Sequence, residues 1–409
     1  MKKNPFPINK YLNLSFGDEF LESLEGALFM VFQRKTHADK AIGKVFAVHK
    51  NWGEGLKGWF ADITYDIIRW RALLVAHSGR PINRKIIEAF FELNGMRIKS
   101  EPLESVEKET PELKSAELKR SDYLSIPEWL DELGYLELGE DWAKEIDAMN
   151  TQAAMALRCN TLKTDIKTLK KRLLEEGITT TLIDGYKTAL LVDQKQNIFK
   201  TKSFQQGLFE VQDPSSQKVA EYLDPKPGMR VIDACAGMGG KSLHLACLMK
   251  NKGKVLSMDN AEWKLAGIKK RAKRAGSNII ETRFIQGTKT IKRLNKSADR
   301  LLLDVPCSGL GVLRRNPDIK WSLQPEDLDE IKKNQAYILN FYSQMLKPGG
   351  IMTYASCSIL PSENENQVNA FLESDRGREF KLIECVNFRP SKTGFDGFFI
   401  ACFKKKNII

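Results

Sequence analysis

The sequence lacks several features that would place it in a familiar class of protein. None of its seven cysteines forms a C-x-x-C pair, so neither a disulfide framework nor a zinc knuckle is expected, and a reducing cytoplasm suits the chain best. No stretch approaches about 18 apolar residues, the length of a membrane-spanning helix. The first residues hold two lysines but no continuous apolar segment, which argues against a secretory signal peptide. We expect a cytoplasmic protein with no membrane partner.

Histidine is scarce as well. The four histidines show no metal-ligand spacing and no Ser-His-Asp arrangement, so we expect structural roles and no bound metal for His37, His49, His77 and His244. The glycine and lysine spacing that cradles ATP phosphates is also missing. These absences leave few of the common hydrolase and nucleotide-binding classes open.

Positive charge, in contrast, is plentiful. The chain holds 64 Lys and Arg against 52 Asp and Glu, which gives a net charge of +12. This excess favours a polyanionic partner such as RNA, because basic side chains release counterions from phosphates; a soluble basic protein without such a partner is the alternative. Lys57, Arg69 and Arg71 are candidate RNA contacts, although charges on a helix flank are more often simply solvated.

The pattern of apolar residues divides the chain into four segments. Residues 1–98 are expected to form a helical domain, since Ile63, Ile67, Trp70 and Leu74 share one face of a helical stretch over 54–77. Residues 99–154 are interpreted as a charged linker and helix, and 155–205 as a small α+β unit. From 206 to 409, strands alternate with helices, which is typical of an α/β protein with a parallel sheet.

A glycine-rich turn follows the first strand of this last segment. Asp233 ends the strand, and Gly237, Gly239 and Gly240 precede a helix, so the backbone can approach a ligand closely there. The next strand ends in Asp259, where an acid can accept both ribose hydroxyls of a bound adenosine. The alternative is a tight turn without a ligand, because such turns are common.

Two cysteines follow neighbouring strands of the same sheet. Cys307 comes shortly after Asp304, and Cys357 ends the expected strand 351–357. Ligands bind at the carboxyl ends of parallel strands, so both thiols are expected over one crevice. A thiolate that attacks carbon 6 of cytosine activates carbon 5 for methylation, and a base must then remove the carbon 5 proton. The alternative is that both are small buried residues, the role expected for Cys159, Cys247, Cys385 and Cys402.

Several motifs give the chain a resemblance to a known family. They are VQDPSSQ (211–217), DACAGMGGK (233–241), DVPCSGLGVLRRNPDIKW (304–321), YASCS (354–358), LPSENENQV (360–368) and GFDGFFIACFKK (394–405). Together they resemble the Sun/RsmB-type RNA cytosine-5 methyltransferases over about 155–409, and more loosely over the helical N-terminus. The resemblance implies a class I, Rossmann-like, S-adenosylmethionine-dependent methyltransferase sheet behind a helical NusB-like RNA-binding domain and a small α+β RNA-binding unit.

The resemblance also implies roles for individual residues. Cys357 matches the position of the nucleophile, and Cys307 matches that of the residue that releases the covalent adduct. Asp304 matches the acid that holds the cytosine edge. The S-adenosylmethionine contacts are expected at Cys235, Ala236, Gly237, Met238, Gly239, Gly240, Lys241, Asp259 and Asp304.

The sequence departs from the family pattern at two places. Gly237-Met238 replaces the usual alanine-proline, which should keep the turn but loosen it. Thr288 stands where an aspartate near the adenine is usual.

The NusB-like segment favours ribosomal RNA as the substrate, and we expect a monomer. A transfer RNA methyltransferase and an inactive ribosome-assembly factor remain alternatives, whereas an amine methyltransferase is disfavoured by Cys307.

Overall fold

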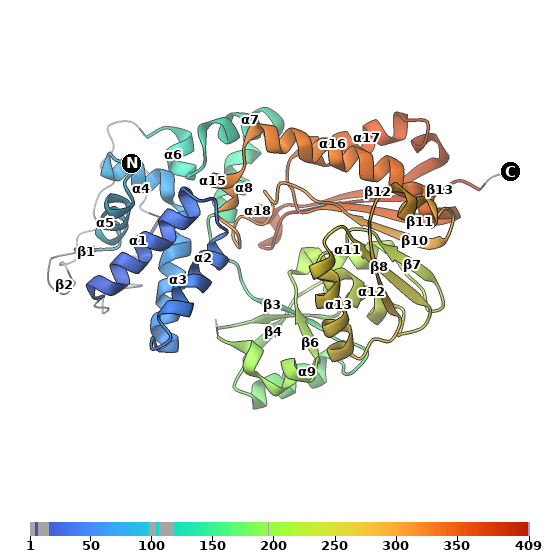
Figure 1. Cartoon of the computed structure of the whole chain (residues 1–409), viewed down its shortest axis with the longest axis horizontal. Coiled ribbons are helices and arrows are strands. Elements are labelled where there is room, and N and C mark those ends of the chain that lie inside the picture. Colours follow the sequence, from blue (N-terminus) through green and yellow to red (C-terminus); the bar gives the residue numbers. More distant parts are fainter. Residues whose placement is uncertain (1–4, 7–15, 98–103, 106–117, 195, 408–409) are drawn as a thin grey trace. The chain divides into compact units, whose positions relative to one another are not determined.

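The computed structural model describes residues 5–6, 16–97, 104–105, 118–194 and 196–407 (Figure 1). The chain forms two compact units. One comprises Met1–Thr151 and Leu313–Pro325, and the other comprises Gln152–Val312 and Glu326–Ile409. Residues 313–325, which the sequence places within the methyltransferase segment, therefore pack with the N-terminal unit.

The first unit is built almost entirely from helices, in keeping with its apolar periodicity. Its core is formed by buried aliphatic and aromatic side chains of α1 to α5. Its elements are α1 (Asp18–Phe32), α2 (Ala38–Val48), α3 (Glu54–Arg69), α4 (Arg71–Ser78), α5 (Asn83–Leu93), β1 (Met96–Arg97), β2 (Glu104–Ser105), α6 (Arg120–Leu124), α7 (Glu128–Leu138), α8 (Asp141–Met149) and α15 (Ile319–Ser322).

The stretch 54–77 is two helices rather than the one that its periodicity suggests. Trp70 separates α3 from α4, with backbone angles of −106° and 21°. The carbonyl of Ile68 accepts a hydrogen bond from the Trp321 indole at 2.7 Å, and that of Arg69 accepts one from Lys320 at 2.7 Å. These side chains replace the usual helical partners of the two carbonyls, so the helix ends at this point.

One of the candidate RNA contacts, Arg69, is wrong, and a second, Arg71, is partly buried. Arg69 is 3% exposed, forms an ion pair with Asp66 and donates to the carbonyl of Arg314 at 3.1 Å. The guanidinium of Arg71 lies over the rings of Phe32 and Trp321, 4.6 and 5.2 Å from their centroids. Both side chains are therefore used within the unit.

The second unit contains two sheets. The smaller has the strand order β4-β5-β3-β6 and carries α9 and α10. Its last strand, β6, lies beyond residue 205, where the sequence suggests that the small unit ends; three residues are too few to show a strand period. The elements are β3 (Ala156–Cys159), α9 (Ile166–Glu175), β4 (Thr180–Leu182), β5 (Ala189–Val192), η1 (Ile198–Lys200), α10 (Lys202–Gln205) and β6 (Phe209–Val211).

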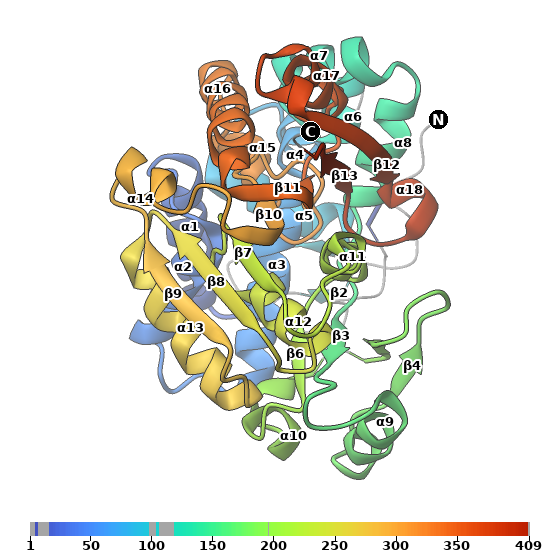
Figure 2. The same ribbon diagram turned by 90° about the vertical axis from the view of Figure 1, so that its right-hand side faces the viewer.

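The larger sheet has seven strands in the order β12-β13-β11-β10-β7-β8-β9 (Figure 2). The five strands from β11 to β9 are parallel, and β13 runs antiparallel to both of its neighbours, β11 and β12. The strands are β7 (Arg230–Asp233), β8 (Lys254–Asp259), β9 (Ile280–Phe284), β10 (Ala298–Asp304), β11 (Leu346–Ser356), β12 (Phe380–Phe388) and β13 (Phe398–Lys405). This arrangement confirms the expected fold class. The chain reverses direction across the sheet between β7 and β10, where ligands bind in such folds.

Helices cover both faces of this sheet. Apolar residues of α11 (Pro214–Leu223) and α12 (Gly240–Leu248) pack on one face, and those of α14 (Thr288–Lys292), α16 (Pro325–Tyr342) and α17 (Glu365–Glu373) pack on the other. The remaining elements are α13 (Glu262–Ala275), η2 (Ser343–Met345), η3 (Pro361–Glu363), η4 (Gly377–Glu379) and α18 (Pro390–Thr393).

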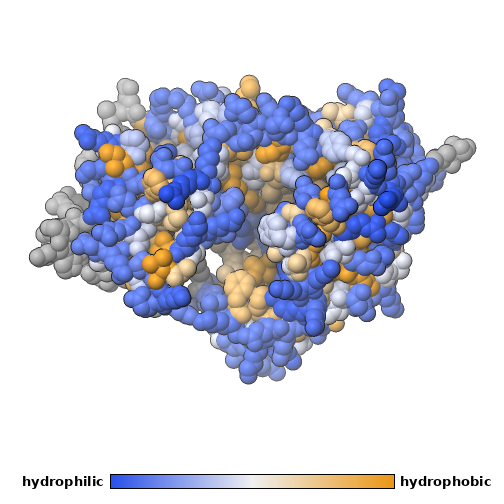
Figure 3. All heavy atoms as spheres, in the orientation of Figure 1, coloured by the Kyte–Doolittle hydropathy of each residue, from blue (hydrophilic) through white to orange (hydrophobic). Residues whose placement is uncertain are grey.

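The surface is largely hydrophilic on the face drawn in Figure 3, with small apolar clusters scattered across it. Within the described part of the chain, no helix has the length and apolar character needed to cross a membrane.

Cys159, Cys247 and Cys402 are buried, as expected. The same expectation is wrong for Cys385, which is exposed because it lies on the edge strand β12.

Candidate active site

The glycine-rich loop joins β7 to α12 and adopts a conformation that requires glycine. Gly237 and Gly239 have φ angles of 53° and 81°, in the left-handed region. A Cβ atom on Gly239 would come within 2.9 Å of Ile268 Cγ1, so α13 leaves no room for a side chain. The turn is therefore present, as expected, although Gly237-Met238 replaces the alanine-proline that is usual in the family.

Asp259, at the end of β8, holds this loop in place. Its Oδ2 accepts a hydrogen bond from the amide of Gly237 at 2.9 Å, and its Oδ1 accepts one from the amide of Ala261 at 2.9 Å. Lys264 Nζ lies 3.5 Å from Oδ1. Each carboxylate oxygen can accept a second hydrogen bond. Asp259 can therefore bind hydroxyl groups while it supports the loop.

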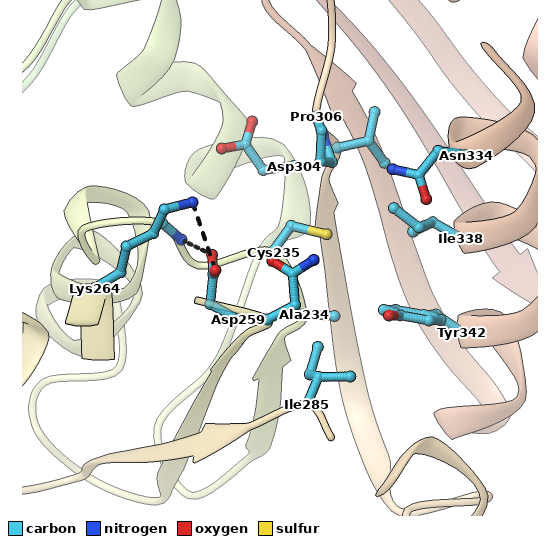
Figure 4. A pocket seen from close by; sticks show the side chains of 13 residues that line it. Ala234, Cys235, Asp259, Lys264, Ile285, Asp304, Pro306, Asn334, Ile338 and Tyr342 are labelled. Carbon is cyan, nitrogen blue, oxygen red and sulfur yellow. Dashed lines mark hydrogen bonds and ion pairs between the residues drawn. The ribbon is translucent and has the colours of Figure 1, made fainter. Parts of the chain in front are cut away.

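A pocket opens between this loop and α16 (Figure 4). Asn334, Ile338 and Tyr342 point into it from α16, toward Asp259 and Cys235. Polar groups lie at Asp259 and Asn334, and the apolar wall is suited to a flat ring. The full lining is Ala234, Cys235, Gly237, Asp259, Asn260, Lys264, Ile285, Asp304, Val305, Pro306, Asn334, Ile338 and Tyr342. An adenosine with a charged tail fits this set of acceptors and apolar surfaces.

The structure separates the residues expected at the cofactor into two groups. Cys235, Gly237, Asp259 and Asp304 line the pocket. The other five form the turn and the start of α12 beside it: Ala236, Met238, Gly239, Gly240 and Lys241. The α16 residues escaped the sequence analysis, because their spacing of four is also that of a helix packed on a core. Thr288 is exposed at the start of α14 and does not line this pocket.

Asp304, at the end of β10, and Lys241, at the start of α12, form an ion pair. Lys241 Nζ lies 2.7 Å from Asp304 Oδ2 and 5.2 Å from the centroid of the Phe398 ring. Burial lowers the pKa of Lys241, but Asp304 and then Cys357 outweigh it, and the pKa is raised. Lys241 therefore remains an ammonium ion and places positive charge near Cys357.

The two predicted cysteines come together at the ends of β10 and β11. Their Sγ atoms lie 3.0 Å apart, and the amide of Cys357 donates to Cys307 Sγ at 3.3 Å. Both side chains are half-buried. The hydrogen bond with Cys357, followed by burial, raises the pKa of Cys307 well above that of an ordinary thiol. One proton shared between the sulfurs would thus be held more tightly by Cys307.

Two glycines fix the backbone around Cys357. The amide of Gly311 donates to the carbonyl of Cys357 at 2.8 Å, and the amide of Gly397 donates to the carbonyl of Gly311 at 2.7 Å. A Cβ atom on Gly311 would lie 2.8 Å from the Cys357 carbonyl and 2.3 Å from that of Gly397. Only glycine allows these three segments to approach so closely.

Asp233 is a buried acid whose charge state the sequence alone does not indicate. It accepts a hydrogen bond from Ser242 Oγ at 2.6 Å, and Ser242 accepts one from Ser257 at 2.8 Å. Burial, with a smaller effect of Asp304, raises its pKa to about 7. His244 is buried beside this region, and burial keeps its pKa low. Among the described residues, no cluster of His, Cys, Asp and Glu is arranged to hold a metal ion.

Comparison with known proteins relates most of the chain to one group. Residues 220–404 match the 16S rRNA methyltransferase RsmB/F family model, and residues 126–199 match the ferredoxin-like domain of RsmF/B-like methyltransferases. The probable ribosomal RNA small subunit methyltransferase B of Bacillus subtilis is 36% identical over 299 residues, which cover 69% of this chain and 67% of that protein. The corresponding protein of Synechocystis is 32% identical over 312 residues, or 72% and 70% of the two chains.

Solved structures share the fold. A methyltransferase homologue from Pyrococcus horikoshii has a TM-score of 0.62 and 27% identity, and the match covers 70% of this chain and 97% of that one. The crystal structure of PH0851 has a TM-score of 0.81 and covers 96% of this chain and 100% of that one, at 24% identity. This second likeness extends over the helical unit as well as the sheet.

Proposed function

Because the chain belongs to the RsmB/F family of 16S rRNA methyltransferases, we propose that it methylates carbon 5 of a cytosine in ribosomal RNA through a covalent bond to Cys357. The observation that supports this proposal most directly is the pair of thiols, whose Sγ atoms are 3.0 Å apart. They follow the strands that border the pocket. A methyltransferase acting on a nucleophilic nitrogen or oxygen needs no such pair.

The pocket suits the S-adenosylmethionine on which this family depends. The cofactor supplies an electrophilic methyl group when it is bound. Asp259 would accept the ribose hydroxyls, since its carboxylate lines the pocket and its Oδ2, which accepts from the Gly237 amide, can accept a second hydrogen bond. Ile285, Ile338 and Tyr342 would pack against the adenine.

The residues around the thiols provide for the first chemical step. Cys357 as a thiolate forms a bond from Sγ to carbon 6 of the cytosine, and the electrons of the 5,6 double bond make carbon 5 nucleophilic. The Lys241 ammonium interacts electrostatically with Cys357 and places positive charge near the sulfur that attacks. Asp304 would hold the polar edge of the base, and its ion pair with Lys241 fixes its orientation.

Release of the product needs a proton acceptor. After methyl transfer, the carbon 5 proton leaves, its bonding electrons restore the 5,6 double bond, and the bond from Sγ to carbon 6 breaks to return the Cys357 thiolate. We assign the proton removal to Cys307, because it is the group in contact with Cys357. The two cysteines then have separate roles in a single catalytic cycle.

The remaining parts of the proposal concern RNA binding. We assign the helical unit to a NusB-like RNA-binding domain, the four-stranded sheet with α9 and α10 to a small RNA-binding unit, and the seven-stranded sheet with its helices to the methyltransferase domain. Residues 99–103 and 106–117 of the expected linker lie outside the described residues. We expect the protein to act as a monomer in the cytoplasm. The net charge of +12 supports binding to an RNA backbone.

Bisulfite sequencing of total RNA from cells with and without the gene tests the proposal. We expect one cytosine of the small-subunit ribosomal RNA to lose its protection from deamination when the gene is deleted, and to regain it with the wild-type gene but not with Cys357→Ala. Loss of protection in transfer RNA instead would identify the alternative substrate. Unchanged protection in every RNA would favour an inactive assembly factor.

A further inference from the structure

A buried carboxylate lies between the two loops that carry the cysteines. Glu363 ends the short helix η3 after β11 and is 0% exposed. Its Oε1 accepts hydrogen bonds from Ser308 Oγ and Ser358 Oγ, each at 2.5 Å. Its Oε2 accepts one from the amide of Ser308 at 2.9 Å. Ser308 follows Cys307, and Ser358 follows Cys357. The Glu363 side chain is therefore hydrogen-bonded to the residue that follows each cysteine.

The same network reaches a helix on one face of the sheet. Gln335, on α16, donates from Nε2 to Glu363 Oε2 at 2.9 Å and to the carbonyl of Pro306 at 3.0 Å. The Tyr354 hydroxyl donates to the carbonyl of Glu363 at 2.7 Å. Cys307 is therefore held between two anchored neighbours, Pro306 and Ser308. This set of bonds fixes the path of its loop more firmly than apolar packing alone could do.

The charge of Glu363 has no cationic partner among the described residues, since its side chain contacts only serine and glutamine donors. A buried carboxylate is stabilised by several hydrogen bonds of this kind, and it then acts as a fixed negative charge. Its field adds to the hydrogen bond from Cys357 and to burial in raising the pKa of Cys307. Cys357, in contrast, interacts with the ammonium of Lys241. The two thiols thus face charges of opposite sign.

We propose that Glu363 is a positioning residue for the methyl-transfer reaction: it holds the Cys307 and Cys357 loops together, and its charge keeps the proton on Cys307 in the resting enzyme. This proposal rests on the proposed function, because it takes Cys357 as the attacking sulfur. It explains why two chemically identical thiols in contact act differently. The 3.0 Å separation of the two sulfurs allows the S–H group of Cys307 to donate to Cys357.

The proton held on Cys307 has a place in the reaction. As Cys357 forms its bond to carbon 6, Cys307 loses its hydrogen-bond acceptor and gives its proton to water. The Cys307 thiolate then accepts the proton from carbon 5 as the bond from Sγ to carbon 6 breaks, and both cysteines regain their starting states. Near Glu363, the Cys307 thiolate is a stronger base than an ordinary one.

The first test measures the ionisation of Cys307 directly. In the Cys357→Ala protein, the rate of iodoacetamide labelling of Cys307 is followed against pH by mass spectrometry of its peptide. We expect a midpoint above the ordinary thiol value of about 8.5, because burial and the charge of Glu363 still raise the pKa of Cys307 when the contribution of Cys357 is absent. Adding Glu363→Gln should lower this midpoint by about one pH unit or more, because a nearby negative charge is removed. The matched control is Glu365→Gln, two residues away, whose carboxylate accepts from Asn387 and touches neither loop.

The second test separates charge from position. In the otherwise wild-type chain, Glu363→Gln should lower kcat at least about tenfold, with little change in KM for RNA, and its pH profile should shift. Glu363→Asp keeps the charge, so it should keep the labelling midpoint of Cys307 while losing activity through the shortened clamp. Glu365→Gln should match the wild type in both assays.

An unchanged Cys307 midpoint in Glu363→Gln, or full activity with an unshifted pH profile, would overturn the proposal. If Glu363→Gln fails to fold, the midpoint in Cys357→Ala alone decides, and a value at or below that of an ordinary thiol would overturn it. The labelling assay needs neither RNA nor cofactor. If Glu363→Gln shifts the midpoint but the wild-type protein leaves carbon 5 unmethylated, the proposed function is refuted while the electrostatic role of Glu363 stands.

Discussion

Cys307 Sγ lies 3.0 Å from Cys357 Sγ, although fifty residues separate the two in the sequence. This contact arises because β10 and β11 are adjacent and parallel, so that both cysteines follow the same edge of the sheet. The two thiols are close enough to exchange a proton. Loss of either should therefore have a distinct effect on the reaction.

We expect Cys357→Ala to abolish methyl transfer and to leave RNA binding intact. Removal of a covalent nucleophile should cost far more than the roughly 10²–10⁴-fold expected for a lost acid or base. Incorporation of tritiated methyl groups into unmodified ribosomal RNA measures the first effect, and a filter-binding assay measures the second. Activity within about tenfold of the wild type would remove Cys357 from this role.

Cys307→Ala should fail at a later step. It forms the adduct and transfers the methyl group but cannot complete elimination, so the protein stays bonded to RNA. We expect a slow, protease-sensitive band on a denaturing gel with substrate RNA and cofactor, and none for the double variant. A band from Cys357→Ala alone would reverse the roles, whereas retained activity of both single variants without a band would exclude a covalent mechanism.

Asp259→Ala should weaken S-adenosylmethionine binding by about 1–3 kcal/mol, the range for a lost hydrogen bond to a charged group. The variant also frees the Gly237 amide, which adds to the loss through a looser loop. Calorimetric titration measures the change in Kd. Asp193→Ala, at an exposed acid next to the four-stranded sheet, is the control and should bind normally. An unchanged Kd for Asp259→Ala would place the ribose contact elsewhere.

The sequence predicted most of the sheet and the two cysteines, because each rests on a local signal. Strand periods, glycines before a helix, and polar residues after a strand are all visible within about ten residues. Other features depend on distant partners. The break at Trp70 depends on side chains of residues 320 and 321, and the role of Glu363 depends on Ser308 and Gln335. Nothing near Arg69 in the sequence indicates that it is buried.

Thr288→Asp is expected to leave S-adenosylmethionine affinity unchanged or to improve it. The residue is exposed at the start of α14, after Ile285, which lines the pocket. An acid at this helix N-terminus is also favourable toward the helix dipole, by about 0.3–1 kcal/mol. Calorimetric titration beside the wild type checks the affinity, and Thr290→Asp serves as a control on the same helix. A clearly weaker Kd for Thr288→Asp would show that threonine itself supports binding.

Gly311→Ala should impair both stability and activity. The new methyl group would overlap the carbonyls of Gly397 and Cys357, and overpacking of this kind costs about 1–3 kcal/mol. The segment that carries Cys357 must move to relieve it. Urea unfolding and methyl incorporation measure the two effects. Gly26→Ala, at a helical glycine with open space around it, should leave methyl transfer unchanged. Wild-type activity in Gly311→Ala would show that the close approach is dispensable.

The buried carboxyl of Asp233 should make stability depend on pH. Its pKa is about 7 in the folded protein, against about 3.9 for an unfolded aspartate. Between these values the folded state keeps a proton that the unfolded state has lost, so the free energy of unfolding falls as pH rises. This contribution is fully present below about pH 3.9 and is lost once the pH passes about 7.

Asp233→Asn removes this dependence, because the amide stays neutral and can still accept the hydrogen bond from Ser242. Relative to the wild type, the variant should gain stability between pH 5 and pH 7 by about 1.4 kcal/mol per pH unit, and no more above that range. Urea unfolding at half-unit intervals of pH measures the difference, and Asp193→Asn provides an exposed control whose difference should stay flat. A constant difference between Asp233→Asn and the wild type would mean that Asp233 is ionised in the folded protein across this range, with its charge stabilised by a donor other than Ser242.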